Sequence, residues 1–97
     1  MTYQELQQAL KVFGLEEQAS LREIKTRHRE LAKRYHPDAG NQGDGKAIRQ
    51  LNEAYRLLLE YTRHYRFSFD EDTFYEQCPE ERVRRQFEED PVWGGRS

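Results

Sequence analysis

Three consecutive residues, His36, Pro37 and Asp38, combine chemistry that suits the recognition of another molecule. The Asp38 carboxylate can accept charge-assisted hydrogen bonds from an arginine, and the His36 imidazole can donate or accept a hydrogen bond. Pro37 fixes its own φ angle and restricts His36, so this tip loses little entropy on binding. In isolation, the same tripeptide is more often an ordinary turn after a helix, because proline and aspartate are common turn residues.

A strongly basic segment leads into this tripeptide. From Ser20 to His36 there are six Lys or Arg residues and two acids, which gives a net charge of +4. Four of these cations lie on or beside one face of a predicted helix: Arg22, Lys25, Arg29 and Lys33. Such a face would attract an acidic partner and speed encounter. The competing interpretation is a solvated helix surface, which is the usual fate of such charges.

The helix that carries this face is predicted over residues 21–35. Ser20 and Glu23 form a capping box at its start. Its apolar face comprises Ile24, His28, Leu31, Ala32 and Tyr35. The helix ends at or just before His36, because Pro37 disfavours helical geometry there. Residues 37–45 hold three glycines and no large apolar side chain, so we expect a flexible, exposed loop, after which Asp44 can cap the next helix.

Two further helices complete the expected frame. Thr2 and Glu5 form a capping box for a helix over about 3–12, which Gly14 ends. A third helix over about 46–60, with an extension through Tyr61 and Tyr65 as the alternative, carries the apolar stripe Ile48, Leu51, Ala54, Tyr55, Leu58 and Leu59. Helices 21–35 and 46–60 predict an antiparallel hairpin with the N-terminal helix packed across it. The fold class is therefore all-α, with the His-Pro-Asp tripeptide at the tip of the hairpin.

The composition agrees with a small helical domain. Hydrophobic and charged residues each make up 35% of the 97 residues, which favours short, charge-coated helices over a thick sheet core. Cys78 is the only cysteine, so no intrachain disulfide is possible. No apolar run is long enough for a signal peptide or a membrane helix, and we expect a reduced, cytoplasmic location and no membrane partner.

Several segments together resemble the J domain, the DnaJ-type co-chaperone module. Phe13-Gly14-Leu15 is similar to the step that ends the first J-domain helix, and Tyr35-His36-Pro37-Asp38 matches the family hallmark. Core positions of the second helix match at Ile24, Leu31, Ala32 and Tyr35. Leu51-Asn52-Glu53-Ala54-Tyr55 resembles the third-helix pattern. The likeness covers roughly residues 2–62 and is closest to the J proteins that keep only the J domain.

This resemblance implies a definite activity. In the family, the His-Pro-Asp loop and the basic face of the second helix dock on the ATPase domain and adjoining linker of a DnaK-type chaperone. Docking stimulates ATP hydrolysis and client capture. The partner-binding residues carried over to this chain are His36, Pro37, Asp38, Arg22, Lys25, Arg29 and Lys33. The competing class is a J-like scaffold that binds without stimulating.

The chain also departs from the family pattern. Glu30 stands where a basic residue is common, His28 stands where an aromatic residue is common, and Ala39-Gly40 replaces a polar or basic pair. The usual basic fourth-helix motif is absent. We expect these differences to affect partner affinity and partner choice.

Residues 2–66 are predicted to form the J domain, and residues 67–97 an acidic, aromatic extension. From Asp70 to Asp90 there are nine acids and three arginines, a net charge of −6. A helix is expected over 79–89, with Pro79 in its first turn and Val83 and Phe87 on one face. One hypothesis is that this tail folds back on the basic helix and inhibits it; the alternatives are a helix packed elsewhere or a disordered end. The aromatic residues from Tyr55 to Phe69 finish the core or form a client-binding patch.

Other classes of function are disfavoured. Basic helices also bind nucleic-acid phosphates, but no aromatic residue interleaves this face and the net charge of the chain is −2, so we expect no nucleic-acid partner. His28 and His36 lie eight residues apart, but Pro37 breaks the register and no clustered ligands complete a metal site. No acid–base pair stands out as catalytic, so we expect no enzymatic activity and no cofactor. We also expect a monomer.

Overall fold

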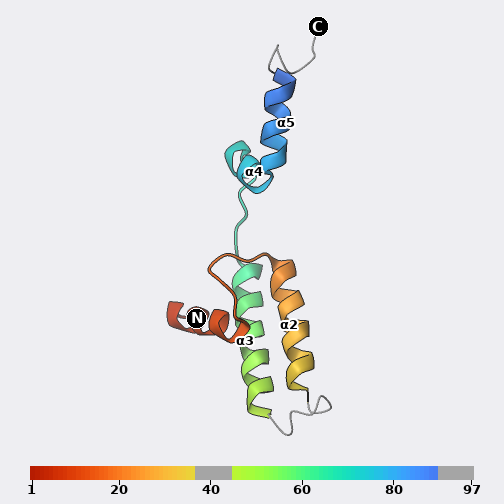
Figure 1. The fold of residues 1–97 in the computed structure, drawn as a ribbon. Coiled ribbons are helices and arrows are strands. Elements are labelled where there is room, and N and C mark those ends of the chain that lie inside the picture. Colours follow the sequence, from red (N-terminus) through yellow and green to blue (C-terminus); the bar gives the residue numbers. More distant parts are fainter. Residues whose placement is uncertain (37–44, 90–97) are drawn as a thin grey trace. The chain divides into compact units, whose positions relative to one another are not determined.

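The computed structural model describes residues 1–36 and 45–89. Predictions that fall on residues 37–44 and 90–97, among them those for Pro37, Asp38 and Asp44, lie outside the described residues. The helices are α1 (Tyr3–Phe13), α2 (Leu21–Tyr35), α3 (Gly45–Arg63), α4 (Glu71–Gln77) and α5 (Pro79–Glu89) (Figure 1). The described residues contain no strand, which confirms the all-α class. The chain divides into two compact units, Met1–Tyr65 and Arg66–Ser97.

Local signals set the ends of α1. The Thr2 hydroxyl accepts the Glu5 backbone N–H at 3.1 Å, but the Glu5 carboxylate bonds to the Thr2 hydroxyl at 3.3 Å. Only one half of the predicted capping box is therefore present. Gly14 ends the helix with φ of 65°, a left-handed conformation that glycine adopts without steric cost, and its N–H bonds back into the last turn.

Helices α2 and α3 form the predicted antiparallel hairpin, and α1 crosses α3 (Figure 1). At Ser20 both hydrogen bonds of the capping box are present, each 3.1 Å long. Helix α3 begins at Gly45 and runs past Glu60 to Arg63, as the alternative extension predicted, but ends before Tyr65. The sequence after Glu60 has no glycine or proline until well beyond the helix, so nothing local stops it there.

One hydrophobic core holds these three helices together. Its buried members are Ala9, Phe13, Ile24, Leu31, Leu51, Ala54, Leu57 and Leu58. Phe13 and Leu51 are 0% exposed and lie at its centre. Leu57 was not part of the predicted stripe. It is buried because α3 packs against both α1 and α2, so its apolar face is wider than one partner would require.

The second unit is built differently. Helix α4 was not predicted from the sequence, since seven residues span too few turns to show a clear apolar period. Asp70 caps it by accepting the Thr73 N–H at 3.1 Å. Neither α4 nor α5 contains a buried residue. In the part of the chain that the structure describes, no helix is long and apolar enough to cross a membrane.

Candidate partner-binding surface

The four predicted cations of α2 form a single exposed stripe, called the α2 stripe below: Arg22, Lys25, Arg29 and Lys33. Their spacing of three, four and four residues places them on one helix face. Ile24 and Leu31 are buried on the other side of α2, so packing against the core turns the α2 stripe toward solvent.

Most of the α2 stripe is not neutralised. Arg22, Lys25 and Lys33 make no ion pair with any other residue in the described ranges. Arg29 donates only to the Thr26 hydroxyl, at 3.3 Å. Cations left open on a rigid helix produce a local positive field that attracts an acidic surface.

The α2 stripe leads directly to His36. This residue follows the last turn of α2 with φ of −67° and ψ of 138°, and it is exposed. Extended geometry here agrees with the restriction that a following proline imposes. The structure thus places His36 one turn beyond Lys33. The other two residues of the predicted tip, Pro37 and Asp38, lie outside the described residues.

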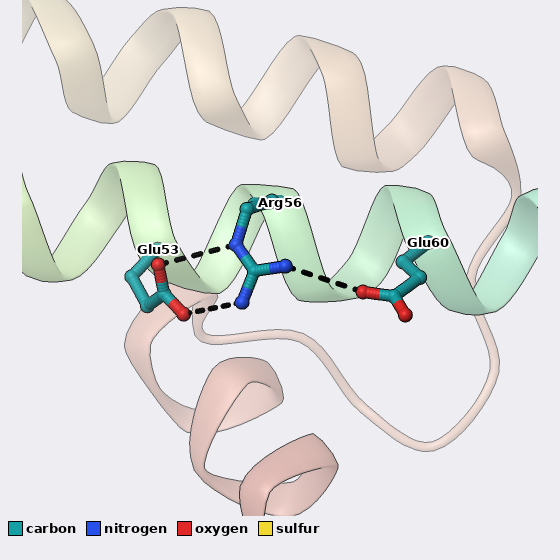
Figure 2. A network of polar contacts seen from close by, with 3 residues as sticks. All are labelled: Glu53, Arg56 and Glu60. Atoms are coloured by element: carbon teal, nitrogen blue, oxygen red, sulfur yellow. Dashed lines mark hydrogen bonds and ion pairs between the residues drawn. The ribbon is translucent and has the colours of Figure 1, made fainter. Parts of the chain in front are cut away.

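Helix α3 offers a direct contrast, shown in Figure 2. Arg56 lies between Glu53, at 2.6 Å, and Glu60, at 3.3 Å, all on one exposed face. The side-chain hydrogen bond between Arg56 and Glu53 raises the pKa of Arg56 and lowers the pKa of Glu53. On this face of α3 the cation is paired with two acids, whereas the cations of the α2 stripe make no ion pair with a described residue. The two helices of the hairpin therefore differ in how these cations are paired.

Arg27 has a structural position that sequence reasoning missed. Its Nε donates to the backbone carbonyl of Phe13 at 2.9 Å, and its guanidinium lies 3.4 Å from the Glu30 carboxylate. The first contact joins α2 to the C-terminal end of α1 and satisfies an otherwise open helix carbonyl. No local pattern reveals it, because Phe13 lies fourteen residues away. Glu30 places one exposed acid beside the α2 stripe.

An aromatic stack fixes α2 against α3. The rings of His28 and Tyr55 lie parallel, with centroids 3.8 Å apart. The Phe13 ring lies at a similar distance from both, 6.1 Å from Tyr55 and 6.3 Å from His28. His28 Nε2 also lies 3.5 Å from the Asn52 Oδ1. His28 therefore belongs to the helix interface. Within the described ranges, no three His, Cys, Asp or Glu side chains are grouped to hold a metal ion.

The DnaJ domain family model matches residues 3–67. A DnaJ-like protein of Mycoplasma pneumoniae is 44% identical over 64 residues, covering 60% of this chain and 20% of that protein. A chaperone protein DnaJ of Ruminiclostridium cellulolyticum is 41% identical over 59 residues, covering 58% of this chain and 15% of its own length. No solved structure matches the chain.

The similarity therefore concerns one module of longer proteins. A third relative, the chaperone protein DnaJ of Exiguobacterium sibiricum, is 36% identical over 69 residues, which is 70% of this chain but 18% of that protein. The chain spans a fifth or less of the length of these curated relatives. The matched module contains the hairpin, the α2 stripe and the His-Pro-Asp tripeptide.

Proposed function

The chain belongs to the DnaJ domain family, and on that premise we propose that it is a co-chaperone of a DnaK-type chaperone. It docks on the ATPase domain and adjoining linker of that chaperone and stimulates ATP hydrolysis. The observation that carries the proposal is the α2 stripe, a row of exposed and mostly unpaired cations on a rigid helix that ends at His36.

Each part of this surface has a physical task. The α2 stripe steers the chain toward an acidic partner and orients it on arrival. At the end of α2, His36 and Asp38 supply directional hydrogen bonds, and Pro37 restricts the backbone between them. The chain gives no catalytic group to the phosphate and is not itself an enzyme. It accelerates hydrolysis by binding the hydrolysis-competent conformation of the chaperone more tightly than the resting one.

A second candidate function rests on Glu30. This exposed acid lies beside the α2 stripe and would oppose an acidic partner. A J-like scaffold that binds a chaperone weakly, without stimulating it, would show this feature. The two functions predict different rates of ATP hydrolysis by the chaperone, because only the co-chaperone raises that rate.

The proposed function also implies a cellular location and a client protein. We expect a cytoplasmic site of action, where a single thiol such as Cys78 stays reduced. We also expect a client protein to be captured by the stimulated chaperone.

Single-turnover ATP hydrolysis by a DnaK-type chaperone tests the proposal. The unmodified chain should raise the rate, and His36→Gln and Asp38→Asn should abolish the increase. Neither should change the thermal unfolding midpoint, because His36 is exposed beyond the last turn of α2 and Asp38 follows it in the sequence. Lys25→Ala and Arg29→Ala should weaken stimulation. Lys11→Ala, which removes an exposed cation from α1, is the matched control and should not.

The outcomes separate the two functions. Stimulation that survives Asp38→Asn would overturn the proposed mechanism. Binding without stimulation, found with several chaperones and a folded chain, would replace the co-chaperone with the scaffold. Equal losses from Lys11→Ala and Lys25→Ala would show that total charge matters and the α2 stripe does not.

A further inference from the structure

The second unit exposes its apolar side chains. Phe69 is 91% exposed, Val83 is 51% exposed and Phe74 is 47% exposed. No residue of α4 or α5 is buried, so these side chains do not form an internal core. Apolar groups gathered on a small folded unit are typical of a surface that binds another molecule.

Two of these rings line an open hollow of about 390 Å³. This hollow, called the α4 hollow below, is lined by Ser68, Phe69, Glu71, Thr73, Phe74 and Gln77. The hydroxyls in this lining are already engaged, because Ser68 Oγ and Thr73 Oγ1 both donate to the Asp70 carboxylate. The lining groups that remain for contact are therefore largely the faces of Phe69 and Phe74, which favour an apolar side chain.

Polar contacts hold the α4 hollow in shape. Asp70 accepts the Thr73 N–H at 3.1 Å and so fixes the first turn of α4. Arg85 of α5 bonds to Glu71 of α4 and to Glu89 at 3.0 Å, and its guanidinium carbon lies 5.6 Å from the centre of the Tyr75 ring. A preformed site of this kind loses less entropy when it binds.

The charge around the α4 hollow is strongly negative. Residues 66–89 contain eight acids and four arginines, a net charge of −4, and no lysine. Two of the arginines, Arg84 and Arg85, are engaged by acids within the unit. Asp72 and Glu76 of α4 are exposed and make no ion pair with any other described residue. A unit with this net negative charge and with open acids on α4 favours a basic ligand over an acidic one.

We propose that the α4 hollow binds a basic segment of a partner protein through one large apolar side chain. That side chain enters between Phe69 and Phe74, while the net negative charge of the unit attracts neighbouring lysines or arginines of the segment. The chain thus has a second interaction surface, separate in chemistry from the α2 stripe: one takes an acidic partner and the other a basic one. This inference does not depend on stimulation of a chaperone.

Three fluorescein-labelled peptides of equal length test the proposal on the full chain. The first alternates lysine with leucine, the second lysine with serine, and the third glutamate with leucine. Fluorescence anisotropy should show the lysine–leucine peptide binding at least about tenfold more tightly than either other peptide, because it alone supplies both the apolar anchor and the positive charge. Its affinity should fall as salt rises, since exposed charges are screened.

Variants locate the binding. Phe69→Ser should lower the affinity for the lysine–leucine peptide about tenfold, because one of the two rings that contact the leucine is lost. Tyr3→Ser is the matched control, because Tyr3 is also a highly exposed ring, 69% exposed, but lies in the first unit. The pair Asp72→Asn and Glu76→Gln should weaken binding, whereas Glu16→Gln and Glu17→Gln in the first unit should not.

Each other result overturns the proposal. Equal binding of the two lysine peptides would show charge attraction only, and equal binding of the two leucine peptides would show apolar contact only. If Tyr3→Ser lowered the peptide affinity and Phe69→Ser did not, the binding site would lie in the first unit. No peptide binding, with concentration-dependent dimerisation in sedimentation that Phe69→Ser abolishes, would assign the α4 hollow to a second copy of the chain.

Discussion

The two units of the chain obtain their structure from different forces. In Met1–Tyr65, eight apolar side chains are buried, and each removes its surface from water. In the described part of Arg66–Ser97, the helices have no buried residue and are held by the Asp70 cap and the ion pairs of Arg85. Burial of a core is worth several kcal/mol, while exposed ion pairs contribute about 0–1 kcal/mol each.

The two surfaces therefore suit different kinds of contact. A rigid core lets α2 present its cations at fixed spacing, which suits a defined contact with a large partner. The second unit buries none of its helical side chains, so its apolar side chains remain available for a ligand. Substitutions that act on only one of the two units can therefore separate their contributions.

The largest expected effect comes from Leu51→Ala in the first unit. Leu51 is 0% exposed at the centre of the core, and removing its side chain should cost about 2–5 kcal/mol of unfolding free energy. The total free energy of unfolding of a small domain is about 5–15 kcal/mol, so the thermal unfolding midpoint measured by circular dichroism should fall steeply. Val83→Ala in α5 is the control and should leave that midpoint unchanged. A large effect of Val83→Ala would contradict the division of forces proposed here.

A smaller effect is expected at the end of α1. Gly14 has φ of 65°, so Gly14→Ala should cost about 1–2 kcal/mol, and its new Cβ would lie 3.3 Å from the Arg27 guanidinium. Gly45→Ala is the matched control, because Gly45 begins α3 without positive φ and with ordinary space around it. Chemical denaturation should show Gly14→Ala destabilised and Gly45→Ala neutral or slightly stabilised. Equal effects would show that the left-handed cap does not matter.

Much of the first unit followed from the sequence. Helix α2 has the predicted bounds because a capping box starts it and a proline follows its end. The exposure of the α2 stripe followed from the position of Ile24 and Leu31 on the opposite face. The use of this stripe for docking stays a prediction.

Tertiary contacts are what the sequence did not reveal. Burial of Leu57 depends on α1 crossing α3, and the bond from Arg27 to the Phe13 carbonyl depends on where α1 ends in space. Helix α4 has seven residues and one dominant local cause, the Asp70 cap, so no periodic pattern marks it. The α4 hollow was missed for the same reason, since its rings come together only once α4 forms.

A local effect is expected from Arg85→Met in the second unit. Arg85 bonds to Glu71 and Glu89, and these hydrogen bonds raise its pKa, so the guanidinium stays charged. Losing it should reduce the helical carbon chemical shifts of residues 71–77 and 79–89 while leaving α2 unchanged. Arg82→Met is the control, because Arg82 makes no ion pair with a described residue. High salt should reproduce part of the Arg85→Met effect, and shifts in α2 of similar size would contradict a local role.

The smallest effect, and the one confined most closely to one element, is the acid response of α4. Hydrogen bonds from the hydroxyls of Ser68 and Thr73 and from the Thr73 N–H lower the pKa of Asp70 from 3.8 to about 2. Because the folded value lies below the unfolded one, this carboxylate stabilises α4 fully above about pH 4 and loses that contribution as the pH falls through about 2. Chemical shifts of residues 71–77, followed through this window, should therefore show α4 losing helix first near pH 2. Asp70→Asn should retain the cap and lose this pH dependence, while Asp70→Ala should lose helix at every pH. Melting of α4 already at pH 4, or an unchanged acid response in Asp70→Asn, would show that another group holds this turn.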